Sequence, residues 1–324
     1  MDLEPRPASD EKLKGFVQVN HIEYREKCHM ERTAPQLCYD VEKNADTDQA
    51  YIDNRYLDVR STFEWSESSP SVRIRLKKMV TTFPYRDPIY IVAIVFLLGS
   101  IDLVINAFFD LLPRTIPSTS FETAETVAVP TTVLIGSVLF FAAGVFDTFG
   151  ALNADSGTLK EDDGKVTYRP ALLGSPEFKW VPSSKKFFDM SMNSLAFQAG
   201  LIVLFGGVVF MFAGIVDFPG VIPEEDNAFF GLVVFGPQII HGALFFVANI
   251  MLAVSEQECW YVLDIYDADW QGAVLNAIGG FAFMVAGFFL FGKYEVQAAV
   301  AAMVGSWAFL IGSLMRWYVV MESW

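Results

Sequence analysis

Six apolar runs, each of about 20 residues or more, begin at Ile89 and dominate the rest of the chain. At about 1.5 Å per residue, a helix of that length crosses the roughly 30 Å hydrocarbon core of a bilayer. A hydrophobic fraction of 53% supports this interpretation, because an ordinary soluble domain of 324 residues is less apolar. The sequence predicts an all-α membrane protein with six transmembrane helices at 89–112, 131–153, 195–216, 229–254, 271–292 and 297–319.

The first 88 residues differ from the rest of the chain. They carry 14 Lys or Arg and 16 Asp or Glu, and no apolar run long enough to span. The opening "MDLEPRPASDEKLKG" lacks the basic start and apolar core of a cleavable signal, so the first span is expected to direct insertion. We expect residues 1–88 to be a mostly polar, weakly ordered cytosolic region that docks on the membrane domain or binds a protein partner.

Positive charges near the spans predict the orientation, because Lys and Arg resist translocation. Residues 1–88 and 154–194 carry 14 and 6 of them, whereas the loops on the opposite side carry only Arg114 and Lys293. Both termini are therefore predicted to be cytosolic. No Lys or Arg occurs between Lys186 and Lys293, and the formal net charge is −15, which argues against nucleic acid as a partner. The expected partner is the lipid bilayer.

Pairs of small residues recur at intervals of seven in four of the predicted spans. A period of seven keeps one stripe on one side of a helix, and a stripe without large side chains lets main chains approach closely in lipid. Phenylalanines stand four residues after a glycine of the stripe at Phe140, Phe210, Phe283 and Phe309 and are expected to fit a neighbour's groove. The expected helix-packing glycines are Gly136, Gly144, Gly206, Gly214, Gly279, Gly287, Gly305 and Gly312.

The stripes also indicate an internal repeat. "GGVVFMFAG" (206–214) matches "GGFAFMVAG" (279–287), and "GSVLFFAAG" (136–144) matches "GSWAFLIGS" (305–313). Odd spans therefore resemble odd spans and even spans resemble even ones. This parity predicts three hairpins in parallel orientation, at 89–153, 195–254 and 271–319.

The last two spans resemble those of a set of uncharacterised fungal multi-pass integral membrane proteins, and their two-helix unit is similar to the YrhK-like membrane hairpin. The resemblance covers about the last 55 residues, and Arg316 stands where Gln is commoner in that pattern. It implies a eukaryotic integral membrane protein, in the plasma membrane or an endomembrane, and it carries over no substrate, cofactor or catalytic residue. The residues that carry it are Trp270, Asn276, Ile278, Gly279, "GSWAFLIGS" at 305–313, Trp317 and Tyr318.

Two ionisable residues, Asp102 and His241, lie deep within predicted spans, each at a cost of roughly 2.5–3.5 kcal/mol at mid-bilayer. They form a candidate intramembrane polar site if they meet, and such a pair can move protons or lock a conformation. In the alternative, each is satisfied separately by water, the main chain, or the nearby Asn106 and Gln238.

Enzyme signatures are missing from the sequence: it contains no Walker loop, no HExxH and no GxSxG. We therefore expect no catalytic, cofactor-binding or metal-binding residues and a non-enzymatic structural or assembly protein with a tightly packed bundle. The alternative is a small proton-linked transporter built around Asp102 and His241. The stripes favour the first reading, because helices that meet main chain to main chain leave little space for a channel.

Overall fold

The computed structural model describes residues 72–322, apart from 155, 157, 163–164, 170, 223–227 and 258–260. Two compact units make up the chain. The larger unit comprises Val72–Gly150 and Ser183–Trp324, and holds the membrane helices. The described part of the smaller unit lies within Ala151–Pro182.

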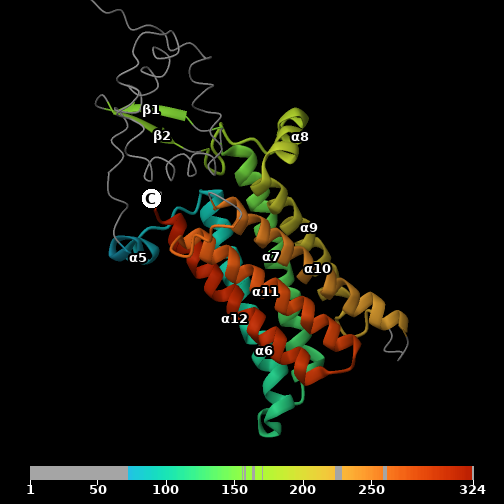
Figure 1. The fold of residues 1–324 in the computed structure, drawn as a ribbon. Coiled ribbons are helices and arrows are strands. Elements are labelled where there is room, and N and C mark those ends of the chain that lie inside the picture. The colour runs from blue at the N-terminus through green and yellow to red at the C-terminus, as the bar shows by residue number, and fades with distance from the viewer. Residues whose placement is uncertain are drawn as a thin grey trace, which may run out of the picture. The chain divides into compact units, whose positions relative to one another are not determined.

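Six long apolar helices confirm the six predicted spans (Figure 1), with ends within a few residues of those expected. All six are long and apolar enough to cross a membrane. They are α6 (Pro88–Thr115), α7 (Val129–Asn153), α9 (Leu195–Val216), α10 (Ala228–Ser255), α11 (Ala268–Phe291) and α12 (Glu295–Val320).

The first helix of every hairpin begins at a side-chain cap. Asp87 accepts a hydrogen bond from the Ile89 N–H before α6, and Asp267 accepts one from the Trp270 N–H before α11. The hydroxyl of Ser194 accepts one from the Phe197 N–H before α9. A capping oxygen satisfies one of the main-chain donors that a helix start leaves free. The helices α6, α9 and α11 therefore each have a defined first turn.

The six helices form a closed ring in chain order. Each packs against the next, and α12 returns to pack against α6. Neighbours in the ring run antiparallel, so the three hairpins α6–α7, α9–α10 and α11–α12 stand side by side in parallel orientation, as the repeat predicts.

Shorter elements accompany the ring. In the larger unit, α5 (Val72–Thr81) precedes α6 and α8 (Ser184–Asn193) precedes α9, while the 3-10 turn η1 (Pro117–Thr119) and the π-turn η2 (Ala124–Ala128) join α6 to α7. In the smaller unit, β1 (Thr158–Asp162) pairs antiparallel with β2 (Lys165–Arg169), which the sequence analysis did not predict.

Helix α5 is the only part of the N-terminal region 1–88, apart from its junction with α6, that the structure describes; residues 1–71 lie outside the described residues. Met79 of α5 packs with Tyr90 and Ala93 of α6 and with Val320 and Met321 at the end of α12. The Arg75 guanidinium pairs with the Glu322 carboxylate at 2.8 Å and lies over the Tyr318 ring. The start of α6 and the end of α12 are therefore on the same side of the bundle, as an even number of spans requires.

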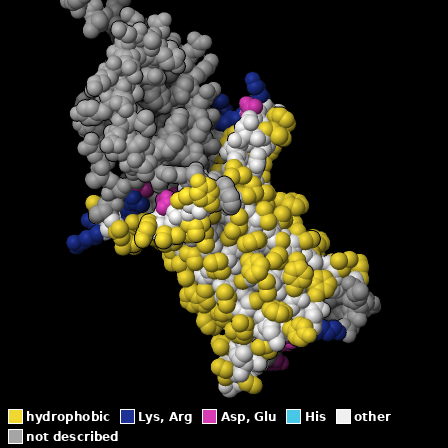
Figure 2. Space-filling view, viewed as in Figure 1, with side chains coloured by type: hydrophobic (Ala, Val, Ile, Leu, Met, Phe, Trp, Pro, Cys, Tyr) yellow, Lys and Arg dark blue, Asp and Glu magenta, His cyan; other side chains and the backbone are white. Residues whose placement is uncertain are grey.

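The sides of the bundle are apolar (Figure 2), and charged side chains gather toward its ends. Large exposed side chains such as Phe205, Leu232 and Phe288 lie on these sides. A surface of this kind suits acyl chains and confirms an integral membrane protein at the level of the fold.

Candidate functional site

Three phenylalanines meet inside the ring, one from the second helix of each hairpin. The ring centroids of Phe140, Phe245 and Phe309 lie 5.6 Å (Phe140–Phe245), 5.4 Å (Phe140–Phe309) and 5.9 Å (Phe245–Phe309) apart. Their exposed fractions are 1%, 1% and 3%. We call these residues the phenylalanine triangle. Its nearly equal sides show that the sequence repeat is also a repeat in space.

Each ring of the triangle lies on a glycine of the first helix of its own hairpin. A Cβ placed on Gly99, Gly206 or Gly279 would lie within 2.9 Å of an atom of the ring above it. Real Cβ atoms do not approach so closely, so a larger residue at these positions would have to displace a buried ring. The pairs are Gly99 with Phe140, Gly206 with Phe245 and Gly279 with Phe309.

The first helices supply three further phenylalanines around the triangle. Phe96 lies 4.6 Å from Phe140, Phe210 lies 6.0 Å from Phe140, and Phe283 lies 5.7 Å from Phe309, between ring centroids. Every helix of the ring thus contributes one phenylalanine to a single apolar cluster. Aromatic side chains of this number, in contact with one another, fill the interior near the middle of the bundle.

The spacing of four residues after a glycine predicts four of these six rings, and it does not predict Phe96 and Phe245. Phe245 was missed because the residue four positions before it is His241 and not a glycine. Phe96 precedes its glycine, Gly99, by three residues. Aligning the second helices on Gly136, His241 and Gly305 provides the signal that finds Phe245.

Main chains meet between hairpins. A Cβ on Gly280 of α11 would lie 2.5 Å from the Phe246 nitrogen of α10, and one on Gly207 of α9 would lie 3.0 Å from the Phe141 Cα of α7. The eight predicted packing glycines all face a neighbouring helix: Gly136 faces Leu103, Gly144 Leu204, Gly206 Phe245, Gly214 Ser137, Gly279 Phe309, Gly287 Ile239, Gly305 Phe283 and Gly312 Asn276.

A hydrogen bond closes the ring where α12 meets α6. The hydroxyls of Ser100 and Ser313 lie 2.8 Å apart, and both side chains are fully buried. Ser100 occupies the repeat position of Gly207 and Gly280. At this interface a polar contact takes the place of the main-chain contact found at the other two.

His241 lies among aromatic rings. Its imidazole stacks on Phe210, with ring centroids 4.2 Å apart and an angle of 12° between the planes. The centroids of Phe245 and Phe283 lie 6.2 Å and 6.1 Å from that of the imidazole. The side chain is buried, and its Nδ1 has no hydrogen-bond partner among the described residues. In the other two hairpins, Gly136 and Gly305 hold the same repeat position. His241 therefore occupies a packing position of the interior.

Asp102 has different surroundings from His241. Its Oδ2 is buried beside Gly136, where α6 meets α7, and has no hydrogen-bond partner among the described residues. No ion pair joins it to His241 within that part of the chain, so the structure does not bring the two together as a bonded pair. Asn106 bonds neither Asp102 nor His241 among the described contacts: its amide donates to the Val129 carbonyl and the Thr132 hydroxyl. Gln238 is half-buried on α10.

Ion pairs join helices near the ends of the bundle. The Arg316 guanidinium bonds the Asp147 carboxylate at 2.6 Å, between α12 and α7, and Arg114 bonds Asp110 at 2.8 Å and also Glu295. Asp217 follows α9, and burial together with the nearby negative charge of Asp110 raises its pKa to about 6. The sequence does not reveal the pairs Arg316–Asp147 and Arg114–Glu295, because the two residues of each pair are far apart along the chain.

A group of carboxylates also lies at the junction of α10 and α11. Ligand atoms of Glu256, Asp267 and Asp269 lie within 4.8 Å of one another, close enough to share a cation. Asp267 already accepts the Trp270 N–H as the cap of α11, which accounts for its position. Nothing else in the described residues points to a ligand there.

Comparison of the chain with protein-family models, curated proteins and solved structures finds no match. The resemblance of the last two spans to fungal membrane proteins and to the YrhK-like hairpin therefore stays a prediction. The geometry of the bundle interior is the basis for a proposal on function.

Proposed function

We propose that this chain is a non-enzymatic membrane protein of structural or assembly type, whose six-helix bundle is a rigid platform in the bilayer. The observation that carries the proposal is the phenylalanine triangle with its three flanking rings. A conduit needs polar, hydrated walls along its axis, whereas this axis is occupied by buried aromatic side chains. The platform would present the N-terminal region 1–88 to a protein partner.

A proton-linked transporter is the competing function. It would use Asp102 and His241 as its intramembrane site, since each has a buried polar atom without a hydrogen-bond partner among the described residues. The separate surroundings of the two residues, one beside Gly136 and the other stacked on Phe210, support separate packing roles over a shared proton path.

Proton flux into vesicles decides between the two functions. The purified full chain is reconstituted with a trapped pH-sensitive dye, and a pH step is applied with and without a membrane potential. We expect the wild type, Asp102→Asn and His241→Phe to match protein-free vesicles. The His241→Phe variant keeps an aromatic ring against Phe210, so it serves as a packing-matched change.

A flux above that of empty vesicles in the wild type, lost in a folded Asp102→Asn variant, would overturn the structural proposal in favour of transport. Folding of each variant is checked by size-exclusion elution and helical circular dichroism before reconstitution.

A further inference from the structure

Helix α5 carries two exposed faces that the rest of the bundle does not cover. Val72, Leu76 and Val80 repeat every four residues along one face, with exposed fractions of 62%, 53% and 68%. Arg73 and Lys77 repeat every four residues along the adjoining face and are also exposed. Residues four apart stack on one side of a helix, so α5 has an apolar stripe bordered by a basic one.

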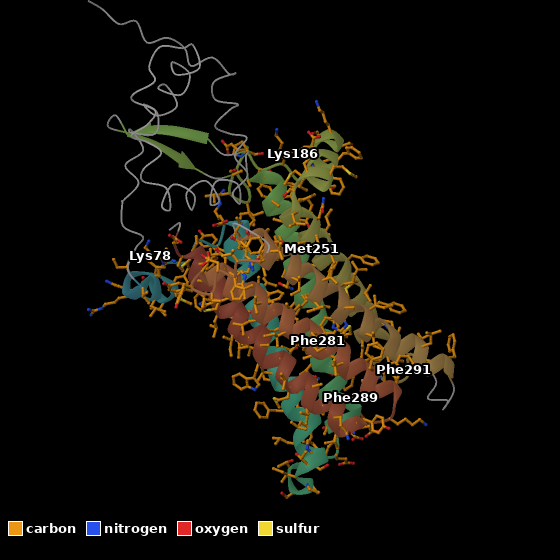
Figure 3. The ribbon with its side chains drawn as sticks, in the orientation of Figure 1. Lys78, Lys186, Met251, Phe281, Phe289 and Phe291 are labelled. Atoms are coloured by element: carbon orange, nitrogen blue, oxygen red, sulfur yellow. The ribbon has the colours of Figure 1, made fainter. Side chains whose placement is uncertain are left out.

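The side of α5 that adjoins the apolar stripe is fixed to the bundle. Arg75 and Met79 are its buried residues, held by Glu322, Tyr318 and the apolar cluster at the start of α6 and the end of α12. Those helix ends lie where the spans leave the hydrocarbon region. The attachment therefore holds α5 at the level of the membrane surface, and Figure 3 shows Lys78 on α5 at this end of the bundle.

The charge of α5 stands out in an acidic protein. Its ten residues, "VRIRLKKMVT", include four Lys or Arg and no Asp or Glu, although the whole chain has a formal net charge of −15. Arg75 is paired with Glu322, whereas Arg73, Lys77 and Lys78 make no ion pair with any described residue. Exposed aromatic side chains, Phe83 and Tyr85, follow in the link to α6, as is common at the lipid–water boundary.

We propose that α5 is an interfacial helix that binds anionic phospholipids of its own leaflet. The stripe of Val72, Leu76 and Val80 lies among the upper acyl carbons, and Arg73, Lys77 and Lys78 contact phosphate and carboxylate groups of the lipid headgroups. This arrangement buries apolar area and pairs cations with negative headgroups, the two contributions that hold amphipathic helices on membranes. The inference is independent of whether the bundle is a platform or a transporter.

Fluorescence quenching in vesicles tests the position and the lipid preference together. The full chain, with Cys28, Cys38 and Cys259 replaced by Ser, carries a single labelled Leu76→Cys. The vesicles are phosphatidylcholine with or without phosphatidylserine, and the quenchers are aqueous iodide and either lipid with a nitroxide on its acyl chain. We expect quenching by lipid and protection from iodide, with the phosphatidylserine probe several-fold more effective than the phosphatidylcholine probe.

Charge variants identify the residues that select the lipid. The ratio measured is the quenching by the phosphatidylserine probe divided by the quenching by the phosphatidylcholine probe. The variant R73Q/K77Q/K78Q is expected to bring this ratio to about 1. The matched control K185Q/K186Q, on α8 at the same end of the bundle, is expected to leave the ratio unchanged. High salt should lower the ratio in the wild type, which gives a second readout that needs no charge variant.

Four results would overturn the proposal. Iodide quenching at residue 76 without lipid quenching places the stripe in water, and protection from both quenchers places a protein partner or a second copy over it. A ratio of about 1 in the wild type, or an equal fall in K185Q/K186Q, removes the role of α5 in selecting anionic lipid.

Discussion

Two interfaces of the ring use the same repeat position in different ways. Where α10 meets α11, Gly280 brings its own main chain against that of Phe246, and Gly242 brings its main chain against that of Met284. Where α12 meets α6, the equivalent position is Ser100, which meets Ser313 through a hydrogen bond. At the repeat position, the first interface is a main-chain contact and the second is a polar contact.

The difference shows what the small-residue stripes require. Apolar burial does not drive helices together in lipid, so a contact gains from close main-chain packing or from a hydrogen bond. The interface between α12 and α6 joins the last span of the chain to the first. A serine pair gives this closure a directional contact, and the glycine interfaces are the ones most sensitive to added volume.

The largest effect is expected from a substitution that breaks the glycine interface between α10 and α11. Gly242→Leu places a side chain into the Met284 main chain, which cannot move without separating α10 from α11. We expect loss of the folded monomer, measured by size-exclusion elution in mild detergent. Gly236→Leu is the control on the same helix, because almost nothing lies near a Cβ at Gly236. A folded Gly242→Leu protein would show that the main chains do not meet there.

The second-largest loss of stability is expected from a substitution in the phenylalanine triangle, which lies inside the ring of interfaces. Phe140→Ala removes a ring that contacts four others, and large buried aromatic side chains cost about 3–5 kcal/mol on truncation to Ala. The free energy of unfolding is measured by titration with sodium dodecyl sulfate. Phe288→Ala, at a surface position, should cost far less. Equal losses in the two variants would argue against a filled interior.

The smallest effect is expected from a substitution that removes the hydrogen bond between Ser100 and Ser313. Ser313→Ala removes the hydrogen bond to Ser100, and such bonds between membrane helices average about 0.6 kcal/mol. The same detergent titration measures the loss. Ser306→Ala is the control, because the Ser306 hydroxyl donates to the Ala302 carbonyl of its own helix. A loss of several kcal/mol at Ser313 would make the closure, and not the glycine interfaces, the main support of the ring.

The sequence predicted the local and periodic features of the bundle. Span lengths follow from apolar runs, and the hairpin repeat follows from pairs such as Gly206/Gly207 and Gly279/Gly280, because both signals lie within one helix. Features that join distant segments were not predicted. The pair Arg316–Asp147 joins residues 169 positions apart, and the triangle brings together Phe140 and Phe245 from different hairpins.

Two local features were also missed. The helix α5 was interpreted as part of a weakly ordered region, because the basic residues of "VRIRLKK" obscure its stripe of residues four apart. The β1–β2 hairpin could have been predicted from Asp163–Gly164, a dipeptide typical of two-residue hairpin turns. For the candidate polar site, depth along the helices placed Asp102 and His241 at similar levels but gave no information on the direction of their side chains.

Main-chain contact between hairpins is the central claim, and adding one methyl group tests it most directly. Unfolding of Gly280→Ala and Gly236→Ala is compared with that of the wild type in the same detergent titration. We predict that Gly280→Ala loses about 1–3 kcal/mol by overpacking, and that Gly236→Ala is as stable as the wild type or gains up to about 1 kcal/mol of helix propensity. A Gly280→Ala protein as stable as Gly236→Ala would contradict the claim.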